Sequence, residues 1–394
     1  MNDFTLYTPT RIQFGNGVHL QAGEMLKKYN ATCVMLHYGS ERIVKSGLLK
    51  EIQNVIEKEG IKTVPFGGVT SNPKFALAME GVKVAKENKV DFILAIGGGS
   101  AIDSAKCIGY GVVNEGDTWD FYAGKKTAVG CLPLGVILTN AAAGSEMGQG
   151  SVVTNEKLGY KKSYRSEFAL LKFALEDPTL STSLPAYQTA SGTFDAAMHT
   201  IERFFTGGDH CALTDEISFA IVRTIIAQTR IVLKDPKNLD ARGNLMWASS
   251  LSHNMLTQSG NSDGGDWACH NMELELGAMF DCPHGAGISA IWKQWALYVY
   301  KENPASFQRF GNQLFGNPVT SDANADALKA IESFNDYIKE IGMPTDMHTL
   351  LGKKVTDEQI KKLSAQCSGN DSHTTGSFKK LTAADMEKIY HAAN

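Results

Sequence analysis

The front of the chain alternates continuous apolar runs with amphipathic stretches. The apolar runs are rich in β-branched residues and lie at 32–37, 61–66, 91–96 and 131–139. Such runs are typical of parallel strands that helices cover on both faces. Segments 41–60 and 73–89 carry apolar residues at helical spacing between them. The alternation predicts βαβ units and a parallel sheet, with a β-hairpin over 150–178 at the sheet edge.

Behind Pro185 the pattern becomes almost entirely helical. Helices are expected at 185–205, 212–234, 238–258, 265–278, 285–301, 304–315, 323–340, 356–366 and 382–393. The change predicts two domains, an α/β domain over 1–183 with a Rossmann-like parallel sheet and an all-helical domain over 184–394.

The overall charge and composition exclude several classes of protein. A formal net charge of −4 on 394 residues gives no electrostatic case for binding nucleic acid or an anionic membrane. No apolar run reaches the ~20 residues of a membrane helix, and residues 1–15 lack the pattern of a secretion signal. The seven cysteines are scattered without a CxxC pair, which favours reduced thiols. We therefore expect a cytoplasmic protein.

A glycine-rich turn, AIGGGSAIDSAK at 95–106, leads from an apolar strand into a helix. Glycines let the backbone approach a bulky ligand, and the N–H groups of a helix N-terminus attract a pyrophosphate. The turn lacks the GxGxxG spacing of the usual dinucleotide fingerprint. Ser100 and Asp103 also have the spacing of a capping box, so a purely structural βα turn is an open alternative.

A second candidate site joins two distant segments. Asp195 and His199 lie one turn apart on the helix predicted over 185–205, and Glu202 shares their face. His270 and His284 follow in GGDWACHNMELELGAMFDCPHGAG, residues 264–287. One carboxylate and three imidazoles suit Fe²⁺ or Zn²⁺ better than Mg²⁺ or Ca²⁺.

Each pair in this set also has an ordinary interpretation. Asp195 and His199 could form an ion pair on a helix surface, His284 could belong to a turn, and His270 could be a buried structural histidine. The remaining histidines, His253 among them, show no comparable spacing, and we interpret them as surface or structural residues.

Four sequence blocks combine these features in a fixed order. They are GGGSAIDSAK, LPLGVILTNAAAGSEM, ALEDPTLSTSLPAYQTASGTFDAAMHTIE and GGDWACH followed by CPHGAG. With them the chain resembles, over its whole length, the group III iron-containing alcohol dehydrogenases, and among these the NADP(H)-dependent butanol dehydrogenase and broad-range aldehyde reductase branch. The resemblance implies a dehydroquinate synthase-like architecture, a homodimer and a metal held by Asp195, His199, His270 and His284.

The resemblance also implies a set of cofactor-binding residues. They are Asn72, Gly97, Gly98, Gly99, Ser100, Asp103, Thr139, Asn140, Ala143, Ser145, Lys161 and Leu180. In similar enzymes an acidic residue after the first strand excludes a 2′-phosphate, whereas this chain has Gly39 and Ser40 there, so NADP(H) is preferred over NAD(H). Arg42 adds favourable charge, and Glu41 opposes the preference if it points inward.

The activity implied is hydride transfer between the nicotinamide and a small primary alcohol or aldehyde such as butanol or butanal, with the metal polarising the substrate oxygen. Two residues depart from the family pattern. Leu274 replaces a histidine that relays a proton in relatives, and Ala143 replaces a frequent threonine.

Other functions stay open at this point. They are an enzyme similar to glycerol dehydrogenase or dehydroquinate synthase, a metal-dependent hydrolase, and a weakly active ligand-binding relative.

Overall fold

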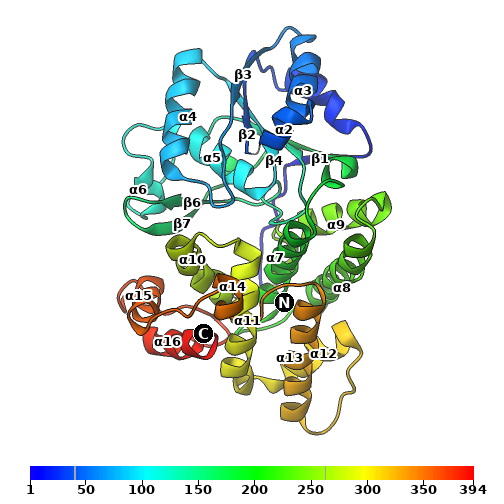
Figure 1. Cartoon of the computed structure of the whole chain (residues 1–394), viewed down its shortest axis with the longest axis vertical. Helices are drawn as coiled ribbons and strands as arrows, with labels where there is room; N and C mark the ends of the chain where they lie inside the picture. Colours follow the sequence, from blue (N-terminus) through cyan, green and yellow to red (C-terminus); the bar gives the residue numbers. More distant parts are fainter. Residues whose placement is uncertain (40, 262) are drawn as a thin grey trace. The chain divides into compact units, whose positions relative to one another are not determined.

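The computed structural model describes residues 1–39, 41–261 and 263–394, which form two compact units. The first unit, which we call the sheet unit, comprises Tyr7–Leu184 and Pro236–Ser250 (Figure 1). The second, the helical unit, comprises Met1–Leu6, Pro185–Asp235 and Leu251–Asn394. The fold class predicted from the sequence, α/β plus all-α, is confirmed. The units differ from contiguous domains over 1–183 and 184–394 because two segments lie with the other unit.

A six-stranded parallel sheet forms the centre of the sheet unit. Across the sheet the strands are β1 (Arg11–Phe14), β8 (Phe173–Glu176), β5 (Leu134–Leu138), β4 (Phe92–Gly97), β2 (Cys33–Tyr38) and β3 (Lys62–Phe66). The strands β2 and β4 pair with each other, with Val34 opposite Phe92, although β3 comes between them in the chain. The chain therefore changes direction across the sheet at β2, and ligands of such sheets bind at the carboxyl ends of the strands next to this switch point.

Helices cover both faces of this sheet (Figure 1). The helical segments of the unit are η1 (Val18–Gln21), α1 (Ala22–Lys28), α2 (Glu41–Lys45), α3 (Leu48–Glu57), α4 (Phe75–Asn88), α5 (Gly99–Val113), α6 (Trp119–Tyr122), η2 (Glu167–Ala169), η3 (Pro178–Ser181) and α9 (Leu239–Ser252) up to Ser250. Successive side chains of a strand point to opposite faces. Val34 and Leu36 accordingly join one apolar cluster with Ile52 and Ile56 of α3.

The hairpin predicted within 150–178 forms, but its position differs from the prediction. Strands β6 (Gly150–Asn155) and β7 (Tyr160–Arg165) make a separate antiparallel sheet instead of extending the edge of the large one. The end of the predicted segment forms β8, which lies between β1 and β5 in the large sheet, and its four residues are accordingly buried. The edge strand β1 was not predicted, since its four residues alternate too briefly to give a pattern.

The segment Pro236–Ser250 joins the sheet unit through polar contacts at the end of α9. Ser249 Oγ donates to the carbonyl oxygen of Ala142 at 2.7 Å. Ser250 Oγ lies 2.6 Å from Oε1 of Glu146 and 2.9 Å from Oε1 of Glu176, and both carboxylates are buried. A helical periodicity cannot reveal such partners, so the sequence could not indicate that this segment lies with the sheet unit.

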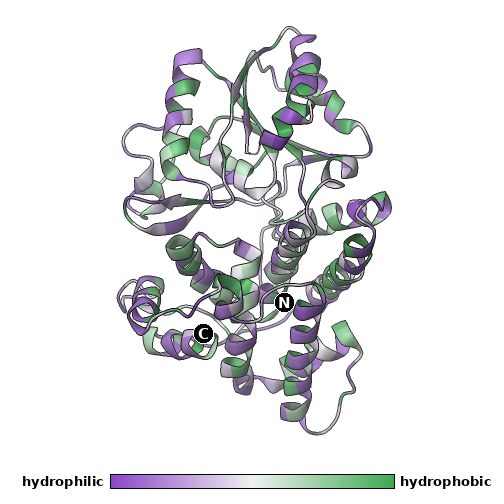
Figure 2. Ribbon diagram, viewed as in Figure 1, coloured by the Kyte–Doolittle hydropathy of each residue, from purple (hydrophilic) through white to green (hydrophobic). Residues whose placement is uncertain are grey.

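The helical unit contains every helix expected behind Pro185 apart from α9. Its helical segments are α7 (Ala186–Phe204), α8 (Ala212–Lys234), η4 (Leu256–Gln258), α10 (Ala268–Phe280), α11 (His284–Val299), η5 (Tyr300–Glu302), α12 (Pro304–Phe315), α13 (Ala323–Glu340), α14 (Met347–Leu351), α15 (Asp357–Cys367) and α16 (Ala383–Ala392). Hydrophobic and hydrophilic residues alternate along many of these ribbons (Figure 2). No helix within the described ranges is long and apolar enough to cross a membrane.

The central helix of this unit is α7, which is buried from Thr189 to Phe204. Its buried length includes Asp195, His199, Glu202 and Arg203 as well as apolar residues. Burying so many polar groups in one helix is costly unless each has a partner. The helix is therefore the natural place to look for a site.

Candidate metal centre and nucleotide-binding turn

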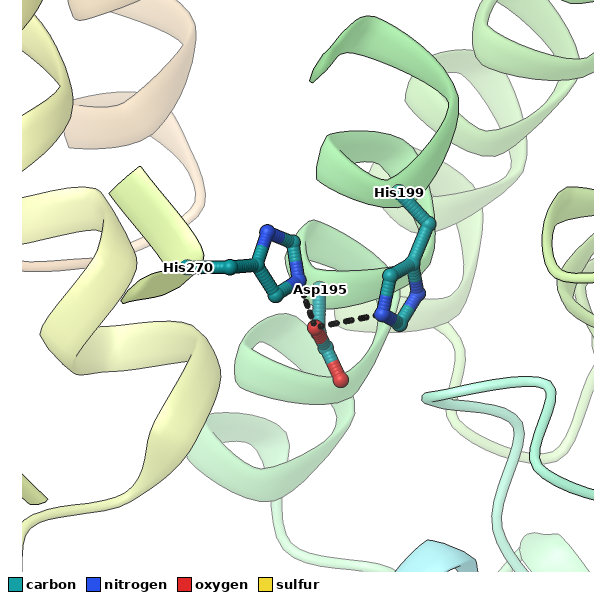
Figure 3. Close-up of side chains that lie close together, drawn as sticks. All are labelled: Asp195, His199 and His270. Atoms are coloured by element: carbon teal, nitrogen blue, oxygen red, sulfur yellow. Dashed lines mark ion pairs between the residues drawn. The ribbon is translucent and has the colours of Figure 1, made fainter. Parts of the chain in front are cut away.

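Three imidazoles converge on one carboxylate oxygen in the helical unit. Nε2 of His199 lies 3.7 Å from Oδ1 of Asp195, one turn earlier on α7. Nε2 of His270, in the first turn of α10, lies 3.4 Å from the same oxygen. Figure 3 shows the two rings on either side of the Asp195 carboxylate. Nε2 of His284, the first residue of α11, lies 3.7 Å from the same Oδ1. The fold thus brings together the four side chains that the sequence singled out as metal ligands.

The loop before α10 explains why His270 reaches α7. Gly265 has a φ of +107°, and a Cβ there would come within 2.7 Å of Cα of Arg203. The backbone N–H of Asp266 donates to the carbonyl oxygen of Glu202 at 2.8 Å. Only glycine permits this approach of the GGDW segment to the end of α7.

The donor set fits a divalent transition metal. Candidate ligand atoms of Asp195, His199 and His270 lie within 4.8 Å of one another, and all three residues are buried. A surface ion pair would be solvated, so the ordinary interpretation of Asp195 and His199 does not match their burial. One oxygen and three nitrogens are typical ligands of Fe²⁺ and Zn²⁺.

Two buried carboxylates hold the outer nitrogens of this cluster. Nδ1 of His270 is hydrogen-bonded to Oε2 of Glu202, and Nδ1 of His284 to Oε2 of Glu273. Glu202 and Glu273 are both fully buried. A carboxylate on Nδ1 leaves Nε2 as the nitrogen with a lone pair, which is the usual arrangement of a metal-binding histidine.

Neither carboxylate was predicted as a site residue. The helical spacing had placed Glu202 on the face of Asp195 and His199, so the signal was present in the sequence. No such signal marked Glu273. Its partner His284 lies on the next helix, so spacing along α10 could not indicate the contact.

A further histidine, His253, also borders the cluster. Its ring centroid lies 4.2 Å from that of His199, a proximity that the spacing of the histidines along the chain did not indicate. Arg203 is fully buried, and its guanidinium group donates to the carbonyl oxygen of His199 at 2.8 Å. The guanidinium carbon Cζ also lies 4.7 Å from the ring centroid of Trp267. These contacts hold the carboxyl end of α7 in place.

The pKa values show where the cluster carries positive charge before a metal binds. Burial, with His253 and His270 next in importance, holds the pKa of His199 well below its ordinary value. Burial also opposes a charge on His270, but the carboxylates of Glu202 and Asp195 outweigh it and raise the pKa to about 9. A divalent cation would replace that proton, as expected for a site whose ligands bind metal in their deprotonated form.

The glycine-rich turn in the sheet unit lies at the carboxyl end of β4. The helix α5 begins at Gly99, and among the described residues no side chain caps its N-terminus. Ser100 Oγ donates to the carbonyl oxygen of Ser71 at 2.6 Å, and Oδ2 of Asp103 accepts from the backbone N–H of Val152 at 3.1 Å. The capping box that was the structural alternative is therefore absent. A helix N-terminus without a side-chain cap is suited to a phosphate.

The segment after β5 packs tightly on this turn. A Cβ at Gly98 would lie 3.1 Å from Cβ of Asn140, and one at Gly99 would lie 3.1 Å from Cβ of Ala143 and 3.3 Å from Oγ of Ser145. Thr139 donates its backbone N–H to the carbonyl oxygen of Gly97 at 3.0 Å. The predicted cofactor residues of these two segments thus lie together.

The side chain of Lys106 holds the far end of that segment. It is completely buried on α5, and Nζ donates to the carbonyl oxygens of Ser145, Gly148 and Gly150 at 2.7–2.8 Å. Burial lowers the pKa of Lys106 to about 8. Lys106 was not among the predicted site residues, although it ends the glycine-rich block.

The other predicted cofactor residues lie around or behind the turn. Asn72 is buried next to Ser71, the partner of Ser100. Lys161 is buried on β7 opposite Thr154, whose N–H donates to the carbonyl oxygen of Pro73. Leu180 in η3 is partly buried and packs against the apolar cluster of the sheet, as a core residue does.

The turn after β2 contains the residues on which the predicted preference for NADP(H) depends. Ser40 lies outside the described residues. A Cβ at Gly39 would come within 2.9 Å of the carbonyl oxygen of Val69, which disfavours any larger residue there. Glu41 is exposed and pairs with Lys45 at 2.5 Å, and Arg42 donates to the carbonyl oxygen of Ser183 at 2.9 Å.

Comparison with known proteins gives matches along nearly the whole chain. Residues 9–178 match the family described as "Iron-containing alcohol dehydrogenase", and residues 189–394 match "Fe-containing alcohol dehydrogenase family, C-terminal". The NADH-dependent butanol dehydrogenase A of Clostridium acetobutylicum is 34% identical, with 99% of each chain covered. The NADPH-dependent aldehyde reductase YqhD of Escherichia coli is 31% identical over 88% of this chain and 89% of its own.

A solved structure extends the comparison to three dimensions. The NADH-dependent butanol dehydrogenase A of Thermotoga maritima is similar with a TM-score of 0.95 and 34% identity. The match covers 100% of this chain and 99% of that one. The match therefore includes both units.

Proposed function

The chain belongs to the iron-containing alcohol dehydrogenase family, and we propose that it transfers hydride between NADP(H) and a short primary alcohol or aldehyde, such as butanol or butanal, at a centre holding Fe²⁺ or Zn²⁺. That it is a metal-dependent, NAD(P)-dependent oxidoreductase acting on alcohols or aldehydes follows from its family and relatives. The observation that carries the finer proposal is the convergence of Nε2 of three histidines on Oδ1 of Asp195.

The residues of this chain divide the work between two sites. Asp195, His199, His270 and His284 hold the metal, and Gly97–Ser100 hold the pyrophosphate of the coenzyme at the N-terminus of α5. When bound, the metal supplies Lewis-acid polarisation of the substrate oxygen, and the nicotinamide supplies the hydride chemistry. Burial of the ligands keeps water away from the charged cluster and strengthens its electrostatic interactions.

The preference for NADP(H) rests on the turn after β2. Gly39 presents no carboxylate to a 2′-phosphate, and Glu41 pairs with Lys45 on the exposed side of α2. The relatives use both coenzymes, since one butanol dehydrogenase is named for NADH and the aldehyde reductase for NADPH. A homodimer stays a prediction from the resemblance, and a cytoplasmic location stays one from the composition.

A weakly active enzyme is a second candidate, and Leu274 is the observation that favours it. The side chain is half-buried on α10, one turn after His270, and it cannot accept or donate a proton. Proton relays contribute ~10²–10⁴-fold to catalysis, so a chain without one is expected to turn over slowly unless another group serves.

The test is a coenzyme assay on the purified chain. Protein stripped of metal is loaded with Fe²⁺ without oxygen, or with Zn²⁺, and mixed with butanal and NADPH or NADH. We expect metal-dependent loss of absorbance at 340 nm, faster with NADPH. Equal rates in the metal-free protein would exclude the metal centre, and faster oxidation of NADH would reverse the coenzyme preference. No oxidation with any short aldehyde would favour the weakly active candidate.

A further inference from the structure

The four candidate ligands are not held equally firmly. The side chains of Asp195, His199 and His270 are 6–10% exposed, whereas that of His284 is 27% exposed. His284 is also the first residue of α11, so no preceding helical turn restrains its ring. It is the ligand that most needs a separate partner to fix its orientation.

Two glycines after His284 allow other groups to pack closely around it. A Cβ at Gly285 would come within 2.0 Å of the carbonyl oxygen of Ser191, so α11 meets the backbone of α7 one turn before Asp195. A Cβ at Gly287 would lie 2.7 Å from Cγ and 3.1 Å from Oε1 of Glu273. The first glycine thus brings His284 to the metal ligands of α7, and the second leaves the space that the Glu273 side chain occupies.

We propose that Glu273, seated in the space left by Gly287, is a positioning residue that fixes the ring of His284 with its proton on Nδ1 and directs Nε2 to the metal. The carboxylate is fully buried and hydrogen-bonded to Nδ1 of His284. The inference rests on the proposed metal centre and adds to it a residue from a different helix. It also explains both glycines in the PHGAG block by packing.

Glu202 performs the same task for His270 in a different way. Its Oε2 bonds Nδ1 of His270, while Oε1 accepts the backbone N–H of Cys269 at 2.8 Å. It therefore joins α7 to the N-terminus of α10, and its loss would disturb the fold as well as the ligand. Glu273 is the better residue to test because its carboxylate reaches the ligand ring from α10, the helix next to that of His284.

The experiment measures metal binding and needs no turnover. Purified full-length protein and its variants are titrated with Co²⁺ in competition with a chelator, and the visible absorption of bound Co²⁺ reports its ligand geometry. We expect Glu273→Ala to bind Co²⁺ ~10–100-fold more weakly, as for other partners of metal-bound histidines, with an altered spectrum. Glu273→Gln, whose amide oxygen still accepts from Nδ1, should stay within a few-fold of the wild type.

Variants of Gly287 test the same proposal independently. Gly287→Ala should displace Glu273 and weaken Co²⁺ binding to a similar degree as Glu273→Ala. In the double variant the added methyl group meets an empty space, so its affinity should equal that of Glu273→Ala alone. Additive losses would show that the two residues act separately and would overturn the proposal.

The matched control is Glu275→Gln, which changes a second buried glutamate of the same helix, one whose charge acts on Cys367 and Tyr390. We expect unchanged Co²⁺ affinity. A loss equal to that of Glu273→Ala would overturn the proposal, as would wild-type affinity and spectrum in folded Glu273→Ala. If the wild type itself bound no metal, the metal centre under Proposed function would fail first, so the two failures are distinguishable.

Discussion

Nε2 of His270 lies 3.4 Å from Oδ1 of Asp195, although α8, α9 and η4 separate their two helices in the chain. We expect His270→Ala to lose at least 100-fold in metal affinity, more than the ~10–100-fold typical of an outer partner, because a direct ligand is removed. Activity should fall with metal content, measured on the same samples. His348→Ala, an exposed histidine of the same unit, should keep both, and activity without metal in His270→Ala would contradict the assignment.

A substitution in the glycine-rich turn should weaken coenzyme binding without affecting the metal centre. In Gly98→Ala the new Cβ would lie 3.1 Å from Cβ of Asn140, so one of the two segments must shift. We expect the Kd for NADPH, measured by fluorescence titration, to rise about tenfold, equivalent to ~1.4 kcal/mol. Metal content should not change because the ligands lie in the other unit. Unaltered coenzyme binding would show that the pyrophosphate lies elsewhere.

Replacing Lys106 should lower both the stability of the fold and the affinity for the coenzyme. Lys106→Met leaves the carbonyl oxygens of Ser145, Gly148 and Gly150 without their buried donor, and each unsatisfied group costs ~1–3 kcal/mol. We expect the free energy of unfolding to drop by about 3 kcal/mol or more in urea titrations. The Kd for NADPH should rise in parallel, and an unchanged Kd would separate this lysine from the coenzyme site.

The buried pair Glu146 and Glu176 predicts a fall in stability toward alkaline pH. One hydroxyl of Ser250 lies within hydrogen-bond distance of both carboxyl groups, and it carries a single proton. Burial, and then Glu146, raise the pKa of Glu176 to about 8 from 4.5. The folded protein therefore keeps a proton that the unfolded chain releases between these values. The stabilisation is complete below pH 4.5 and lost as pH rises through 8, by at most ~1.4 kcal/mol per pH unit.

Urea unfolding of Glu176→Gln between pH 5 and 8 tests this. The amide that replaces the Glu176 carboxyl group cannot titrate, so the free energy of unfolding of this variant should depend less on pH than that of the wild type. Glu80→Gln, which changes an exposed glutamate of the same unit, should keep the wild-type slope. Identical slopes in all three proteins would contradict a proton held by the pair.

Leu274 predicts a gain of function. If proton transfer limits turnover, Leu274→His should raise kcat for butanal reduction at least tenfold, within the ~10²–10⁴-fold that such relays contribute. The solvent deuterium isotope effect on kcat should fall at the same time. Leu274→Gln, which has similar polarity but no basic nitrogen, should not be faster. An unchanged kcat in Leu274→His would show that another group already moves the proton.

Features that repeat within one element were readable from the sequence. The spacing of Asp195, His199 and Glu202 places them on one face of a helix wherever that helix lies, because helical geometry is local. The continuous apolar runs at β2, β4 and β5 predicted covered parallel strands for the same reason. The glycine-rich turn was recognisable because its glycines lie between a strand and a helix in the chain itself.

Features that depend on which elements meet were decided by the tertiary structure. Nothing in the spacing of α10 shows that Glu273 faces His284, since that contact depends on the space at Gly287 of the next helix. Helix α9 fits either unit by its periodicity, and Ser250 finds its carboxylate partners only in the folded sheet unit. Hydrophobic patterns specify which face of a helix is buried, whereas its neighbour follows from packing and hydrogen bonds between distant segments.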